Sequence, residues 1–124
     1  MKPSDVSDPM PGYRYHSPDV PLAAIRRFAR QLGERFHPDR IILFGSYASG
    51  AASPDSDVDL LVVLPHDDKG WRVATQMRQR VRPSFPMDLI VRTPQQIRDR
   101  LALDDPFVRE VIERGHVLYE AARR

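Results

Sequence analysis

Two short apolar runs on either side of a polar segment constrain this chain more than any other feature. The runs are residues 41–44 and 60–64, and the segment between them begins with Gly45 and Ser46. Apolar runs of this length with turn-forming residues at their ends are typical of buried strands. Gly45 permits a sharp exit from the first strand, and Ser46 suits the N-cap of a short helix that reaches Ser49. The sequence therefore predicts a strand, a tight turn with a short helix, a loop and a second strand.

Two carboxylates, Asp57 and Asp59, lie next to the second apolar run. Residues i and i+2 of a strand point to the same face, so these two side chains are expected to lie close together. Neighbouring carboxylates repel unless a cation lies between them, and Mg²⁺ usually takes one or two protein carboxylates together with water and phosphate. The free N–H groups at the start of the short helix, with the Ser46 hydroxyl, suit an anion. An anion-binding turn beside a cation site favours phosphoryl or nucleotidyl transfer.

The spacing of these residues is similar to a known signature. Gly45-Ser46, ten intervening residues and Asp57-Val58-Asp59 resemble the motif of the polymerase-β-type nucleotidyltransferase superfamily. The segments SPDSDVDLLVVL and DPFVREVIERGHVLYE are similar to those of its small members, the minimal nucleotidyltransferases. The resemblance implies an α/β (α+β) fold of the polymerase-β-like nucleotidyltransferase type, with a small mixed sheet flanked by helices. The domain is expected to span residues 19–124.

The resemblance also implies a role for each candidate site residue. Gly45 and Ser46 would hold the β- and γ-phosphates of a nucleoside triphosphate, expected to be ATP. Asp57 and Asp59 would hold the Mg²⁺ that bridges those phosphates. Asp88 would be the third acid, which helps to hold a second Mg²⁺ and takes the proton of the attacking hydroxyl.

Two positions and the motif as a whole allow another interpretation. Asp88 opens the apolar segment 87–92, and from the residues alone it is a strand-end carboxylate that faces water. Ser49 stands where family members often have Arg, so either a phosphate-binding cation is lost or another Arg replaces it. A degenerate domain of the same fold without activity is the alternative for the whole motif. The presence of both Asp57 and Asp59 favours an active site.

The rest of the chain shows helical periodicity interrupted by Pro and Gly. Trp71, Ala74, Met77 and Val81 recur at helical spacing, which predicts a buried Trp71. Residues 1–18 are rich in Pro, Ser and Asp, and we expect a flexible arm there. The further predicted elements are a helix from Asp19 to Phe36, a helix at 70–82, helices that begin after Thr93 and Asp105, and strands at 87–92 and 116–119.

Length and composition exclude several classes of function. A chain of 124 residues is expected to form one domain, and the absence of cysteine excludes disulfides, Cys-based zinc sites and a thiol nucleophile. No apolar run approaches the roughly 20 residues of a membrane span, and the first residues lack the apolar core of a signal peptide. A cytoplasmic protein is therefore expected. Arginines are interleaved with acids at a formal charge of +2, which does not demand a nucleic-acid partner.

Three hypotheses for the acceptor remain open. Stand-alone minimal nucleotidyltransferases resemble antitoxins that adenylylate a tyrosine of a HEPN-type ribonuclease toxin, and the small size of this chain favours a partner protein that supplies the acceptor. Enzymes of the aminoglycoside-modifying type are the second possibility, although they usually add a helical domain. A binding module that masks a partner by contact alone is the third. Nucleic-acid polymerisation is the least expected, because no domain that grips RNA or DNA follows.

Overall fold

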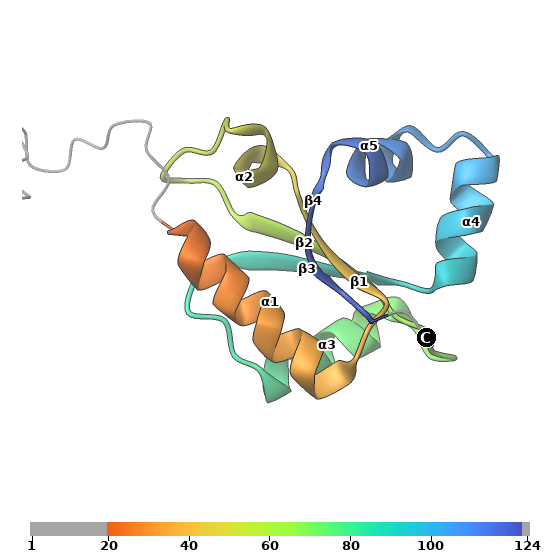
Figure 1. Cartoon of the computed structure of the whole chain (residues 1–124), viewed down its shortest axis with the longest axis horizontal. Coiled ribbons are helices and arrows are strands. Elements are labelled where there is room, and N and C mark those ends of the chain that lie inside the picture. The colour runs from red at the N-terminus through yellow and green to blue at the C-terminus, as the bar shows by residue number, and fades with distance from the viewer. Residues whose placement is uncertain (1–19, 123–124) are drawn as a thin grey trace, which may run out of the picture.

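The structure is a computed structural model that describes residues 20–122 (Figure 1). The predicted arm at 1–18 and the predicted helix start at Asp19 lie outside the described residues. The helices are α1 (Leu22–Phe36), α2 (Ser46–Ser49), α3 (Gly70–Arg80), α4 (Pro94–Ala102) and α5 (Pro106–Arg114), and the strands are β1 (Arg40–Phe44), β2 (Val58–Val63), β3 (Met87–Arg92) and β4 (His116–Glu120). No helix in residues 20–122 is both long and apolar enough to cross a membrane.

One mixed sheet is formed by the strands of the described region, in the order β3-β2-β1-β4. β1 is antiparallel to both β2 and β4, whereas β2 and β3 are parallel. A parallel pair needs a crossover connection, which is usually a helix, and α3 provides it. This arrangement confirms the fold class expected from the sequence, a small mixed sheet flanked by helices.

Helices cover both faces of the sheet, so that the core has two layers (Figure 1). Residues of α1 and α3 pack on one face, against Leu60 and Val62 of β2. Residues of α4 and α5 pack on the other face, against Leu61 and Val63. Because both faces of β2 are buried beyond Asp59, residues 60–63 form a continuous apolar run rather than an alternation of apolar and polar residues.

Trp71 is not in the core, so this prediction was wrong. Its side chain is 65% exposed, and the guanidinium of Arg72 lies 5.4 Å from the ring centroid. The buried residues of α3 are Val73, Ala74 and Met77. At 3.6 residues per turn, Trp71 lies roughly 120° around the helix from Met77, whereas Val73 lies only about 40° away. Ala74 and Met77 are buried as the helical spacing predicted, but the third buried residue of α3 is Val73 rather than Trp71.

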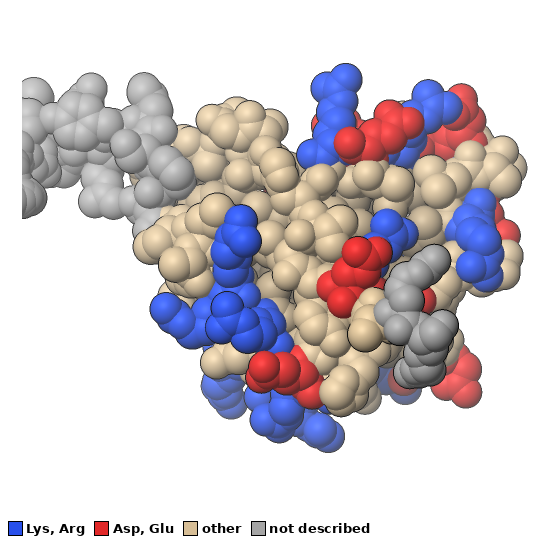
Figure 2. Space-filling model, viewed as in Figure 1, with Lys and Arg blue, Asp and Glu red and all other residues tan. Residues whose placement is uncertain are grey.

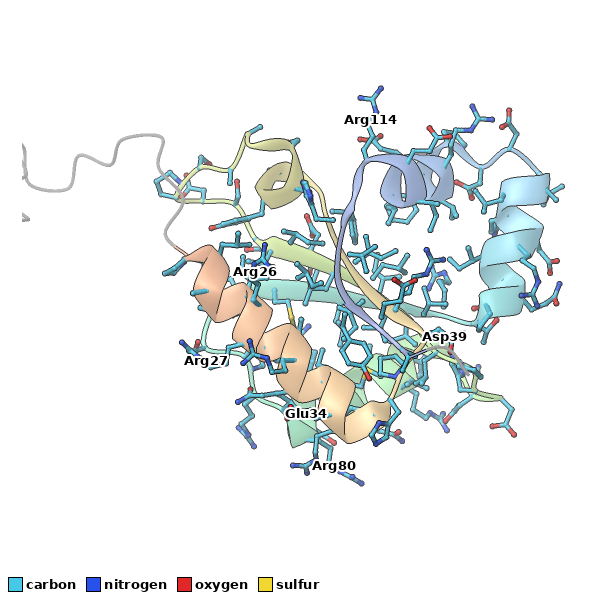
Figure 3. All side chains as sticks on the ribbon, in the orientation of Figure 1. Arg26, Arg27, Glu34, Asp39, Arg80 and Arg114 are labelled. Atoms are coloured by element: carbon cyan, nitrogen blue, oxygen red, sulfur yellow. The ribbon has the colours of Figure 1, made fainter. Side chains whose placement is uncertain are left out.

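Basic side chains gather over α1 and the neighbouring part of α3 on the face shown in Figure 2. Arg27 of α1 and Arg80 of α3 point away from the sheet (Figure 3), whereas Arg26 lines a pocket beside β1 and β4. All three side chains are exposed. Arg26 and Arg27 lie outside the set of α1 residues that are buried against the sheet. Arg114, at the end of α5, lies well apart from this basic surface (Figure 3).

Candidate active site

The turn after β1 is built on Gly45. This residue is the N-cap of α2 and has φ 75° and ψ −154°, a conformation that is essentially restricted to glycine. Ser46 was expected to be the N-cap, but it is the first helical residue. The positive φ of Gly45 reverses the chain one residue earlier than a serine cap would. The helix has only four residues and ends at Gly50, which also has a positive φ.

Gly45 lies directly against a carboxylate of the next strand. The antiparallel register of β1 and β2 pairs Phe44 with Asp59, so the first residue of the turn lies beside the Asp59 side chain. A Cβ atom added to Gly45 would collide with Oδ2 of Asp59. Glycine is therefore required here both for its backbone conformation and for the close approach of turn and carboxylate.

The parallel pairing of β2 and β3 brings the predicted acids together. Asp59 and Asp88 are partners in the register, and Asp57 lies immediately before β2. Asp59 and Asp88 share the sheet face of Leu61 and Ile90, which is the face that α4 and α5 cover. Asp59 and Asp88 therefore meet at the end of the sheet where the turn lies, and Asp57 is near enough for its charge to act on Asp59.

Asp59 is the most enclosed of the three acids. Its pKa is raised above the ordinary value of 3.8, first by partial burial, then by the charges of Asp88 and Asp57, and last by a hydrogen bond with Asp88. Asp57 and Asp88 are exposed. Each effect disfavours the charged form of Asp59, and a cation beside the carboxylates would reverse the two charge effects.

The donor chemistry of this cluster fits Mg²⁺. Carboxylate oxygens are the ligands that Mg²⁺ takes from proteins, usually one or two of them, and water and substrate phosphate complete its octahedral shell. Within residues 20–122, no group of three or more His, Cys, Asp or Glu side chains is already arranged to hold a metal. Two carboxylates, those of Asp57 and Asp59, match the number that Mg²⁺ usually takes from a protein.

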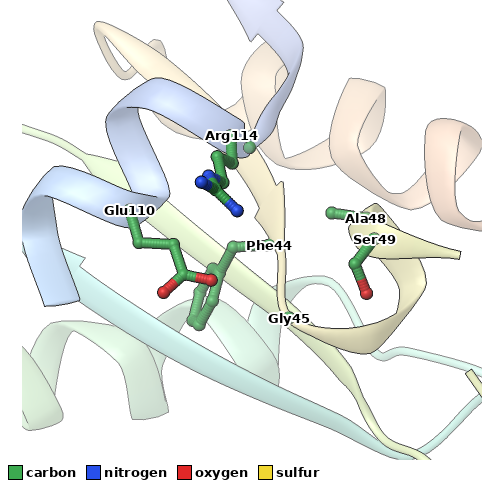
Figure 4. Close-up of a pocket in the computed structure, with 7 residues that line it drawn as sticks. Phe44, Gly45, Ala48, Ser49, Glu110 and Arg114 are labelled. Atoms are coloured by element: carbon green, nitrogen blue, oxygen red, sulfur yellow. The ribbon is translucent and has the colours of Figure 1, made fainter. Parts of the chain in front are cut away.

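A pocket of about 290 Å³ opens beside the turn and is lined by residues of β1, α2 and α5 (Figure 4). Gly45 and Ser49 line one side, and Glu110 and Arg114 line the other. Sequence reasoning did not single out Arg114. No local pattern marks it, because its position beside the turn depends on the pairing of β4 with β1.

Comparisons with known proteins bear on the family and the fold of this chain. Residues 25–119 match the family model described as a nucleotidyltransferase domain. A search of curated proteins found no significant match. A solved structure of a candidate nucleotidyltransferase from Sulfolobus solfataricus is similar, with a TM-score of 0.57 and 20% identity, covering 80% of this chain and 79% of that one.

A second similar structure is described as a toxin–antitoxin with AMP-PNP. It has a TM-score of 0.51 and 21% identity, and the match covers 77% of this chain and 73% of that one. At such identities the two solved structures show that the fold is shared. The family match is the stronger finding because it spans most of the described region. The chain belongs to the nucleotidyltransferase domain family.

Proposed function

We propose that this protein is a Mg²⁺-dependent nucleotidyltransferase that moves AMP from ATP onto a hydroxyl group of a partner protein. The observation that carries the proposal is the meeting of the turn with the acids. Asp59 pairs with Asp88 across two strands, and Gly45 packs against the Asp59 carboxylate. The proposed phosphate-binding turn and the proposed cation site are therefore neighbours, which supports transfer from a nucleoside triphosphate.

In the proposed reaction the protein positions the triphosphate and the attacking hydroxyl, and it helps to neutralise the phosphate charge. Asp57 and Asp59 would hold Mg²⁺, which when bound neutralises phosphate charge and lowers the pKa of the attacking hydroxyl. Gly45 and Ser46 hold the β- and γ-phosphates, and the missing Cβ of Gly45 lets the turn lie against the Asp59 carboxylate. Asp88 accepts the hydroxyl proton. The hydroxyl oxygen bonds to the α-phosphorus, the bond from that phosphorus to the bridging oxygen breaks, and pyrophosphate leaves with the electron pair.

We propose further that the partner is a toxin of the HEPN type and that the protein acts as its antitoxin. One solved structure with this fold is described as a toxin–antitoxin with AMP-PNP, which supports both a protein partner and an adenine nucleotide. Residues 20–122 form a single sheet with its covering helices, and we propose that a second protein supplies the acceptor hydroxyl. A small-molecule acceptor and neutralisation by binding alone are the alternatives.

Labelling tests the proposal. The purified protein is incubated with Mg²⁺, α-labelled ATP and a lysate of its source, and the proteins are separated on a denaturing gel. A labelled protein band is expected, and it should be lost in Asp57→Asn and Asp59→Asn. Asp55→Asn is the matched control, because Asp55 is an exposed carboxylate of the same loop that has no proposed role.

Each alternative gives a different result. Label on a cationic aminosugar with no protein present would favour a small-molecule acceptor. Neutralisation of a toxin that survives both Asp57→Asn and Asp59→Asn would favour binding alone. Label in no protein or small-molecule fraction, from a protein that remains folded, would contradict transfer.

A further inference from the structure

We infer that Arg114 supplies the cation that binds the triphosphate. It faces the pocket that the uncharged Ser49 also lines. The inference rests on the proposed function and deepens it by naming a nucleotide-binding residue outside the sequence motif. Ser49 has no charge with which to hold a phosphate. Arg114 comes from α5, 65 positions later in the chain, and faces the same pocket.

The pocket places Arg114 across from the turn. Ala48 and Ser49 of α2 form one wall, and Arg114 forms part of the opposite wall together with Glu110 of α5 (Figure 4). The volume of about 290 Å³ is at the small end of ligand pockets, which measure roughly 300–1,000 Å³. It suits a phosphate group better than a whole nucleotide.

The pocket lies next to the acid cluster. Gly45 lines the pocket and also lies against the carboxylate of Asp59. Phe44, another lining residue, pairs with Asp59 across β1 and β2, so that their side chains stand on the same face of the sheet. A triphosphate whose α-phosphate lies at the acids would therefore extend past Gly45 toward Ser49 and Arg114.

The end of α5 is fixed in place beside α2. The N–H of Gly115 donates to the carbonyl of Val111 at 2.9 Å, and a Cβ atom on Gly115 would collide with that carbonyl and with Ile42 of β1. His116 Nε2 lies 2.9 Å from the carbonyl oxygen of Ala48 and links β4 to the turn helix. Because the backbone on both sides is held, only the Arg114 side chain must be ordered when phosphate binds.

The charges in the pocket favour this role. Arg114 makes no ion pair with another of the residues 20–122. A guanidinium can donate two parallel hydrogen bonds to a phosphate, which a lysine cannot reproduce. Glu110 lines the same pocket one helical turn earlier and opposes an anion. Replacing it with the neutral Glu110→Gln should therefore strengthen triphosphate binding.

Calorimetric titration with a non-hydrolysable ATP analogue and Mg²⁺ tests the inference on the full chain. Arg114→Ala should weaken binding of the analogue by about ten- to a hundredfold, the range for a hydrogen bond to a charged group. Binding of AMP, which lacks the β- and γ-phosphates, should change much less. Arg114→Lys should recover part of the affinity. Arg109→Ala is the matched control, because Arg109 is an exposed arginine of the same helix that contacts Asp104.

A rescue variant separates this role from a structural one. Ser49→Arg in the Arg114→Ala background should restore affinity for the analogue, because it returns a cation to the turn. Equal binding by wild type and Arg114→Ala would overturn the inference and leave the proposed function intact. A wild-type protein that binds no triphosphate would contradict both. Arg114 is exposed, and unfolding curves together with Arg114→Gln guard against a folding defect.

Discussion

Gly45 is constrained both by its backbone conformation and by its contact with a proposed catalytic residue, Asp59. Its φ of 75° and ψ of −154° lie in a region where a side chain is strained, and its missing Cβ makes room for the Asp59 carboxylate. Gly50, at the other end of α2, also has a positive φ, of 83°, but a Cβ atom there would meet nothing within 4 Å. A side chain at either glycine would strain the backbone, but only a side chain at Gly45 would also collide with Asp59.

We predict that Gly45→Ala lowers both stability and activity. The strained conformation should cost about 1–3 kcal/mol, and the collision displaces Asp59 from its place at the site. Gly50→Ala is the control, because it has only the strain and should retain transfer activity. Urea unfolding and labelling assays of both variants give the comparison. Equal losses of activity in the two variants would show that contact with Asp59 is unimportant.

The raised pKa of Asp59 predicts a pH-dependent stability in the absence of metal. The folded state holds the Asp59 proton more firmly than the unfolded state does. This contribution to stability is fully present below the ordinary pKa of 3.8 and is lost as the pH rises through the higher folded pKa. With EDTA, Asp59→Asn should therefore be more stable than wild type at pH 7, and the difference should shrink as the pH falls toward 4.

Thermal unfolding across this pH range measures the effect. Asp55→Asn should show no such gain, because Asp55 is exposed and lies outside the acid cluster. Saturating Mg²⁺ should reduce the advantage of Asp59→Asn, since a bound cation relieves the repulsion from Asp57 and Asp88. An Asp59→Asn variant less stable than wild type at pH 7 in EDTA would contradict the prediction.

At the scale of elements, caps decide where the helices on the second face of the sheet begin. Thr93 Oγ1 accepts from the N–H of Gln96 at 3.0 Å, and the Gln96 side chain accepts from the N–H of Thr93 at 2.9 Å. Asp105 caps α5 by accepting from the N–H groups of Phe107 and Val108. Both helix starts could be predicted from the sequence, because a capping residue and Pro at the first helical position are local features.

Thr93→Ala should destabilise the protein by about 1 kcal/mol through loss of the cap. Thr75→Ala is a matched substitution with a different expected result. Thr75 is exposed within α3 and its hydroxyl donates to the carbonyl of Trp71, so Ala at this position should be neutral or slightly stabilising. Chemical denaturation of the two variants makes the comparison. Equal destabilisation by both would mean that the capping box contributes nothing specific.

Local sequence signals also explain which elements could be predicted. The bounds of β3 and the start of α3 were predicted correctly, because Pro, Gly and apolar runs mark them. Trp71 was placed wrongly since the spacing of a few apolar residues fits more than one helix face. The strand order could not be obtained from such signals. It depends on long-range pairing, in which β4 joins β1 rather than β3.

At the scale of the whole molecule, one end of the sheet collects residues from distant parts of the chain. Asp88 reaches Asp59 through the parallel pairing of β3 with β2, and Arg114 reaches the turn through the pairing of β4 with β1. The motif residues could be chosen from their spacing and from the family resemblance. Arg114 could not, because its distance from Ser49 is a property of the assembled fold.

If the acids and the turn form one site, we predict that metal binding and nucleotide binding stabilise the protein cooperatively. If the phosphates complete the shell of a Mg²⁺ held by two carboxylates, each ligand should bind more tightly when the other is present. A ligand at 100 times its Kd stabilises a protein by about 2.7 kcal/mol, which for a domain of this size raises Tm by about 10 °C or more. Mg²⁺ and a non-hydrolysable ATP analogue together should therefore raise Tm by more than the sum of their separate effects.

Differential scanning calorimetry with each ligand alone and with both tests the coupling. Asp59→Asn should lose the part of the shift that depends on Mg²⁺, because one of the two proposed ligands is gone. Arg114→Ala should reduce the shift caused by the analogue while leaving the metal dependence in place, since it acts on the phosphates and not on the ion. An analogue that stabilises the protein equally in EDTA and in Mg²⁺ would show that the acid cluster and the turn do not form a single site.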